Sequence, residues 1–102
     1  MLTRETAITM AKDYVSLCNE KDIKFSHVYV FGSSVNGNAG VDSDVDLLLV
    51  SEQFTENTLT NWKMLAPFSA KMYEIDPHPY PVAAFIKRDP FVNEVLKTGI
   101  RI

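Results

Sequence analysis

The sequence lacks the features of a secreted or membrane-spanning protein. Its only cysteine, Cys18, cannot form a disulfide within the chain, and it lies in a segment with amphipathic helical spacing. The longest apolar run, Val82 to Ile86, has five residues, which is too short for a membrane-spanning helix. Arg4 and Glu5 stand where a secretory signal would need an apolar block. We therefore expect a cytoplasmic protein without a membrane partner, in which Cys18 packs in the core.

Positive charge is also scarce. Ten Lys and Arg residues stand against thirteen Asp and Glu residues, which gives a net charge of −3. A protein that binds mainly by neutralising the phosphates of a long nucleic acid carries excess positive charge, so nucleic acid is not expected as the main ligand. A nucleotide bridged by a metal ion is still compatible with this charge, because the cation supplies the positive charge.

What is present predicts one small layered domain, residues 1–102, with 46% hydrophobic and 23% charged residues. Periodicity and turn residues predict this order: helix 3–20 with Thr3 as its N-cap, strand 27–31, a turn or short helix, strand 44–50, helix 59–65 closed by Pro67, strand 71–76, and a final helix with Asp89 as its cap, Pro90 in its first position and Gly99 at its end. The alternate prolines after Asp76 predict the end of the third strand. The expected fold class is α/β (α+β), with a small mixed sheet, helices mainly on one face and the other face partly open.

Two aspartates begin the second predicted strand. Asp44 and Asp46 share a face by the strand period of two, with Cα atoms about 6.6 Å apart. Two carboxylates 4 Å apart repel by about 4 kcal/mol at an effective dielectric of 20, and a divalent cation removes that penalty. An exposed strand edge that discourages pairing is the alternative interpretation. The four apolar residues that follow, 47–50, favour a metal site at the start of a buried strand.

A glycine–serine bend follows the first predicted strand. Gly32 and Ser33 offer backbone N–H groups and a hydroxyl to phosphate oxygens, without a bulky side chain in the way. Ten residues separate Ser33 from Asp44. If the bend at the end of one strand is to face carboxylates at the start of the next, the two strands must be antiparallel neighbours. The sequence therefore predicts a mixed sheet, with residues 33–36 as a helix N-terminus at the phosphates.

Two segments carry these features: Gly32-Ser33-Ser34-Val35-Asn36-Gly37 and Ser43-Asp44-Val45-Asp46-Leu47. Together they resemble the signature of the nucleotidyltransferase superfamily of the DNA polymerase beta type. The resemblance is to its minimal stand-alone bacterial members, the MNT domains. It implies the nucleotidyltransferase fold, a nucleoside triphosphate as substrate and two Mg²⁺ ions. Gly32, Ser33 and Ser34 would hold the phosphates, and Asp44 and Asp46 would bind the metal ions.

The resemblance also implies a third catalytic and metal-binding carboxylate on a neighbouring strand. Asp76, at the end of the third predicted strand, is the first candidate, and Glu74, on the same face, is the second. This carboxylate would help to deprotonate the acceptor hydroxyl while the ions stabilise charge on the reacting oxygens. Asn36 stands where many relatives have an arginine, which removes one cationic contact to the triphosphate.

By the same resemblance, the reaction would transfer a nucleoside monophosphate, AMP from ATP, and release pyrophosphate. The chain has no residues left for an acceptor-binding domain, so the acceptor is expected to be a hydroxyl of a partner protein. Minimal domains of this kind are similar to antitoxins that bind a helical HEPN ribonuclease toxin and adenylylate it on tyrosine, which makes such a protein the expected partner. The alternative is a catalytically weak or inactive module that only binds a partner.

Three side chains outside these motifs invite a functional interpretation. His78, between two prolines, is predicted to be a rigid turn residue half in solvent rather than a substrate contact. Trp62 could stack on a nucleobase, but its helical spacing with neighbouring leucines predicts a core residue. His27, at the start of a strand, is predicted to lie at the surface.

Overall fold

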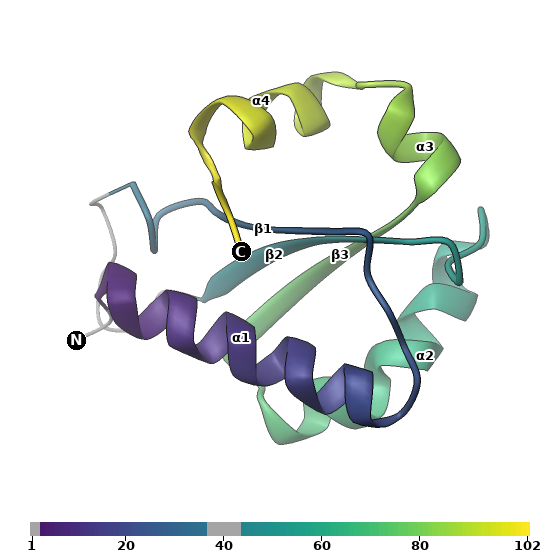
Figure 1. Cartoon of the computed structure of the whole chain (residues 1–102), viewed down its shortest axis with the longest axis horizontal. Coiled ribbons are helices and arrows are strands. Elements are labelled where there is room, and N and C mark those ends of the chain that lie inside the picture. Colours follow the sequence, from purple (N-terminus) through teal and green to yellow (C-terminus); the bar gives the residue numbers. More distant parts are fainter. Residues whose placement is uncertain (1–2, 37–43) are drawn as a thin grey trace.

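A computed structural model describes residues 3–36 and 44–102. Its elements are α1 (Arg4–Glu20), β1 (His27–Phe31), β2 (Val45–Ser51), α2 (Thr58–Lys71), β3 (Ile75–Pro81), α3 (Val82–Ile86), α4 (Pro90–Thr98) and β4 (Ile100–Arg101). The strands form one four-stranded sheet in the order β3-β2-β1-β4 (Figure 1). Strand β1 pairs antiparallel with β2 and β4, whereas β2 pairs parallel with β3. The mixed sheet confirms the predicted fold class and the antiparallel pairing of the two strands that carry the motifs.

The two long helices, α1 and α2, cover one face of the sheet (Figure 1). Thr3 caps α1 as predicted, because its side chain accepts a hydrogen bond from the Thr6 N–H. The larger core cluster lies between these helices and the strands, and its members include Ala7, Ala11, Tyr14, Cys18, Val30, Val45, Leu47, Leu49, Leu65 and Phe68. Cys18 is thus a core residue, as expected. No described helix is both long and apolar enough to cross a membrane.

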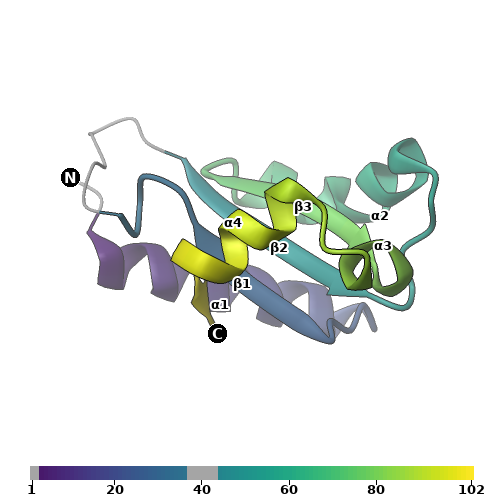
Figure 2. The ribbon, with the colours of Figure 1, turned by 90° about the horizontal axis from the view of Figure 1, so that it is seen from above.

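The short helices α3 and α4 lie over the other face. Figure 2 shows α4 above β1 and β2, and α3 beside the end of β3. Asp89 caps α4 by accepting a hydrogen bond from the Val92 N–H, and Pro90 follows in the first turn, both as the sequence predicts. The cluster under these helices is smaller, and its buried members are Leu48, Val50, Phe85, Val92 and Val95. The long helices thus cover one face and the short helices lie over the other; α3 and β4 were not among the predicted elements.

The third strand is the main correction to the expected fold. Strand β3 spans Ile75–Pro81, whereas the predicted strand 71–76 largely overlaps the end of α2 and the following turn. The prolines do not end the strand, because β3 lies at the edge of the sheet. Pro77, Pro79 and Pro81 alternate along the strand, so the backbone nitrogen atoms of all three point to the free edge, away from β2. A proline has no N–H to donate, and none is needed on that free side.

Helix α2 is the second correction. It continues past Pro67, and its buried face is turned relative to the predicted one. Leu65 is buried as expected, but Leu59 and Trp62 are 62% and 41% exposed, so the prediction of Trp62 as a core residue is wrong. The polar Asn61 takes the buried place, because its side-chain amide exchanges hydrogen bonds with the Thr55 backbone.

Candidate active site

Two carboxylates meet on neighbouring strands. Asp46 of β2 and Asp76 of β3 are direct partners in the parallel register. Asp46 shares its side of β2 with Leu48 and Val50, so both carboxylates lie on the face that α3 and α4 cover only in part. Their side chains are 26% and 44% exposed, respectively. Asp46 on the interior strand β2 is therefore less exposed to solvent than Asp76 on the edge strand β3.

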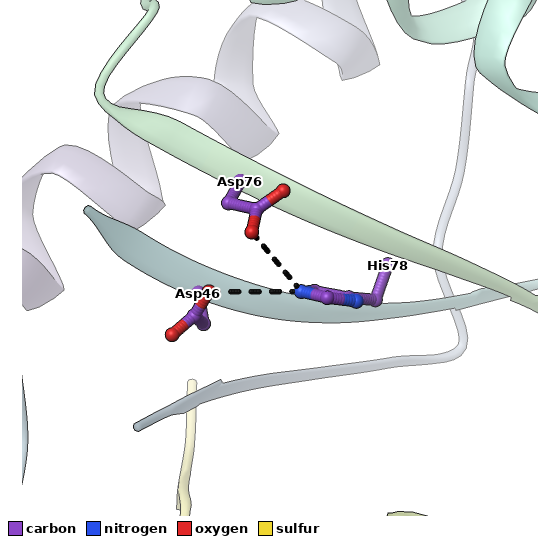
Figure 3. Close-up of polar contacts among 3 residues, drawn as sticks. All are labelled: Asp46, Asp76 and His78. Atoms are coloured by element: carbon purple, nitrogen blue, oxygen red, sulfur yellow. Dashed lines mark ion pairs between the residues drawn. The ribbon is translucent and has the colours of Figure 1, made fainter. Parts of the chain in front are cut away.

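His78 completes this group. Its Nε2 atom lies 3.6 Å from Asp46 Oδ1 and 3.5 Å from Asp76 Oδ2 (Figure 3). One ligand atom from each of the three residues can be chosen so that all lie within 4.8 Å of one another. The prediction of His78 as a turn residue is wrong, since β3 continues past Asp76 and places both on one face. The spacing of two between Asp76 and His78 was the signal that could have found it.

The electrostatics of the group favour a cation. Burial raises the pKa of Asp46, the nearby Asp76 raises it further, and His78 lowers it. Asp76 is thus close enough to destabilise the charge of Asp46. A divalent cation among the three side chains would relieve this repulsion.

Gly32 packs directly against the Asp46 carboxylate. It has a φ of +82°, which favours glycine, and a Cβ atom built on it would collide with Asp46 Oδ2. The register explains the approach, because Phe31, the residue before Gly32, pairs with Asp46. The expected juxtaposition of the bend after β1 with a carboxylate of β2 is present in the structure.

The residues after Gly32 form a turn. The N–H groups of Val35 and Asn36 both donate to the Gly32 carbonyl, each at 3.2 Å, so residues 33–36 form a turn rather than the predicted helix N-terminus. Ser33 is exposed. Ser34 is buried, and its Oγ has no hydrogen-bond partner among the described residues. The rest of the segment that resembles the phosphate-binding motif, including Gly37, and Ser43 before Asp44 lie outside the described residues.

Asp44 and Glu74 lie outside the cluster that the described residues form. Asp44 is exposed and directly precedes β2, which begins at Val45. Glu74 precedes β3, and its backbone carbonyl accepts a hydrogen bond of 2.8 Å from the Val45 N–H. The structure thus brings Asp76, rather than Glu74, beside Asp46, and it adds His78, which was predicted to lie in a turn.

A cavity of about 460 Å³ adjoins His78. Trp62 of α2, Tyr80 of β3 and Ala84 of α3 contribute to its lining, so it opens at the edge of the sheet beyond the carboxylates. Gly32, next to β1, lies on the opposite side of Asp46 from this cavity. The site therefore has a glycine bend on one side and a partly aromatic cavity on the other.

The second histidine is remote from this group. His27 pairs with Val50 at the far end of β1, and its ring stacks on Phe85 with centroids 4.9 Å apart. It is half-buried rather than on the surface, so that prediction is wrong. Burial lowers the pKa of His27.

Comparison with known proteins shows which family and which solved folds the chain is similar to. The family model described as "Nucleotidyltransferase domain" matches residues 16–101, whereas no curated protein sequence matches the chain. A solved structure assigned as a nucleotidyltransferase from Sulfolobus solfataricus has a TM-score of 0.69 at 21% identity, covering 96% of this chain and 80% of that one. A toxin-antitoxin structure with AMP-PNP has a TM-score of 0.61 at 14% identity, with 88% and 70% covered. The toxin-antitoxin pair MntA-HepT gives 0.55 at 13% identity, with 91% and 68% covered.

Proposed function

Because the chain belongs to the nucleotidyltransferase domain family, we propose that it is a metal-dependent adenylyltransferase that moves AMP from ATP to a hydroxyl of a partner protein. The observation that carries the proposal is the pairing of Asp46 and Asp76 on neighbouring strands, with Gly32 packed against Asp46. Carboxylates from two strands beside an unobstructed glycine bend suit a triphosphate and its metal ions.

The side chains fit a divalent cation. Two carboxylates offer the oxygen ligands that Mg²⁺, the ion implied by the resemblance, prefers. His78 Nε2 is buried and has no hydrogen-bond partner within the described ranges 3–36 and 44–102, which leaves it available as a ligand. Asp46 and Asp76 would hold the ion, and Asp44, exposed at the start of β2, is proposed to bind a second one. Such ions would neutralise charge that develops on the phosphoryl oxygens.

The remaining roles follow from position. The N–H groups of the bend at Gly32, the exposed Ser33 hydroxyl and the neighbouring Ser34 would bind the phosphates that leave as pyrophosphate. Asp76, the more exposed carboxylate, would accept the proton of the attacking hydroxyl. Asn36 is exposed beside this bend and would offer the triphosphate a neutral contact.

The cavity beside His78 suits the acceptor. In phosphoryl transfer the attacking and leaving oxygens lie roughly in line with the phosphorus atom. Since the leaving pyrophosphate would lie at Gly32, the acceptor hydroxyl would approach from the opposite side, where Trp62 and Tyr80 line the cavity. Leu59, one helical turn before Trp62, is also exposed and would extend an apolar contact surface for a partner.

Two of the similar structures are toxin-antitoxin complexes, and one of them contains AMP-PNP. They support the proposal that the acceptor protein is a helical HEPN-type toxin and that this chain acts as its antitoxin. The alternative is a module that binds such a partner without transferring AMP. The absence of an arginine at Asn36 favours that alternative, whereas the crowded pair of Asp46 and Asp76 favours the enzyme.

The test is transfer of label from α-³²P-ATP in Mg²⁺ or Mn²⁺, with the protein alone and with the product of the adjacent reading frame. We expect a labelled acceptor with the wild type and with Asp13→Asn, a matched control on the exposed surface of α1. Asp46→Asn and Asp76→Asn should lose the label. Partner binding by all four proteins, with no label on any protein, would contradict the enzyme and establish the binding module.

A further inference from the structure

The spacing within the Asp46, Asp76 and His78 group is that of metal ligands rather than of hydrogen-bonded groups. A hydrogen bond from an imidazole nitrogen to a carboxylate oxygen has a length of about 2.7–3.2 Å. His78 Nε2 lies 3.6 Å and 3.5 Å from the two carboxylate oxygens, beyond that range. With metal–ligand bonds of about 2.0–2.2 Å, neighbouring ligand atoms of a tetrahedral site lie about 3.3–3.6 Å apart. The two distances from Nε2 therefore match two edges of such a coordination shell, and all three ligand atoms lie within 4.8 Å of one another.

The imidazole of His78 is also held in place. Its ring packs against Phe31 and Phe91, with centroid distances of 5.2 Å and 5.5 Å. Its Nε2 atom is buried and unpartnered in the described part of the chain. Leaving a buried polar atom without a partner costs about 1–3 kcal/mol. Two aromatic rings thus aim this nitrogen between two carboxylates, where a cation would satisfy it.

We propose that His78 is a nitrogen ligand to the divalent cation held by Asp46 and Asp76, and that it makes this site prefer transition-metal ions over Mg²⁺. The proposal rests on the proposed function for the presence of a metal site, and it adds the identity of a ligand and of the ion. Imidazole is a ligand for Zn²⁺ and its neighbours, whereas Mg²⁺ selects oxygen and keeps several waters. A site with one nitrogen and two carboxylates therefore discriminates between these ions by ligand chemistry.

The test is metal binding by the full-length protein in the absence of nucleotide. Isothermal titration with Zn²⁺ and with Mg²⁺ is compared for wild type, His78→Gln and His27→Gln, the last removing the only other histidine of the chain. We expect loss of His78 to lower Zn²⁺ affinity by about 10–100-fold and Mg²⁺ affinity by less than about 3-fold. His27→Gln should bind both ions like the wild type.

A spectroscopic readout identifies the ligand directly. Pulsed EPR of bound Mn²⁺ should show coupling to an imidazole ¹⁴N nucleus in wild type and in His27→Gln, and none in His78→Gln. If His78→Gln does not fold, coupling in His27→Gln is still decisive, since His78 is its only remaining histidine. A His78→Asp variant, with three carboxylates, should shift the preference toward Mg²⁺.

Unchanged Zn²⁺ affinity in a folded His78→Gln protein, or absence of nitrogen coupling in His27→Gln, would overturn the inference. These outcomes are separate from those of the transfer assay, because no nucleotide or acceptor is present. AMP transfer without nitrogen coupling would leave the proposed function intact and remove His78 from the metal site. Nitrogen coupling without AMP transfer would keep His78 as a metal ligand and contradict the proposed transfer activity.

Discussion

The two faces of the sheet differ in what they contribute to the protein. Toward α1 and α2, the side chains of β2 are Val45, Leu47 and Leu49, all buried in the larger core cluster. Toward α3 and α4, the same strand presents Leu48 and Val50 to a smaller cluster and carries the carboxylate of Asp46 near its start. Neighbouring residues of a strand point to opposite faces, so β2 contributes to stability on one side and to the candidate site on the other. We call the side of Val45, Leu47 and Leu49 the stable face, and the side that carries Asp46 the chemical face.

The largest expected effect comes from the chemical face. Asp46→Asn should lower AMP transfer by about 10³-fold, the loss expected when several kcal/mol of metal-dependent stabilisation is removed. It should not destabilise the fold. The folded-state pKa of Asp46 is raised, so its ionised form opposes folding at neutral pH, and the neutral amide removes that penalty. Transfer assays and urea unfolding measure both effects, and a destabilised variant would contradict this division of the faces.

The neighbouring residue should behave in the opposite way. Leu47→Ala leaves a cavity in the larger cluster, where Leu47 is fully buried, and should lower the free energy of unfolding by about 2–5 kcal/mol. Leu59→Ala, at a leucine that is 62% exposed, is the matched control and should change it by less than about 0.5 kcal/mol. Below its unfolding transition, Leu47→Ala should still transfer AMP. A folded but inactive variant would show that the two faces are not independent.

Replacement of Gly32 should affect both the stability of the fold and the binding of ATP. Gly32→Ala forces a side chain into a φ of +82° and against the Asp46 carboxylate, and should cost about 1–3 kcal/mol of stability. It should also weaken ATP binding, because the bend must shift. Ser33→Ala, at the exposed next position, should weaken ATP binding without loss of stability. Equal unfolding curves for wild type and Gly32→Ala would refute the close packing of the bend.

The cavity at the edge of the sheet should affect the acceptor only. Trp62→Ala removes aromatic surface worth about 1–2 kcal/mol of contact and should raise the KM for the acceptor about 10-fold, with the KM for ATP unchanged. Lys63→Ala, an exposed neighbour on α2, is the control. The chain has one tryptophan, so its fluorescence should respond to the acceptor and not to ATP. A change in the KM for ATP alone would assign the cavity to the nucleotide instead.

The smallest effect concerns the reactivity of Cys18, which is buried on the stable face. Burial raises the pKa of the Cys18 thiol to about 12, so almost no thiolate exists at pH 8. Reaction with a thiol reagent such as DTNB should be slow in the native protein and fast in urea. Leu47→Ala should accelerate it, and Asp46→Asn should not. Rapid labelling of the native wild type would show that α1 opens readily from the sheet.

Local patterns accounted for one part of this protein. The caps at Thr3 and Asp89, the first two strands and the glycine bend depend on residues near each other in the chain, and the structure has them where the sequence predicts. The antiparallel pairing followed from a single requirement, that the bend after the first strand and the carboxylates at the start of the next strand face each other. Family resemblance added Asp76, whose place beside Asp46 no local pattern could show.

The sequence by itself therefore determined the small mixed fold, the caps of its first and last predicted helices at Thr3 and Asp89, and the glycine bend that faces a carboxylate of the next strand. Tertiary structure alone decided that a proline-rich segment becomes a strand, because only an edge position leaves the missing N–H groups without consequence. Because β3 continues through this segment, His78 lies beside the carboxylates of Asp46 and Asp76. Tertiary packing also set the rotation of α2, because Asn61 hydrogen-bonds to the loop that precedes the helix. This rotation leaves Trp62 exposed beside a cavity. Alternation and propensity are properties of neighbours in sequence, whereas edges and cavities exist only once the sheet has assembled.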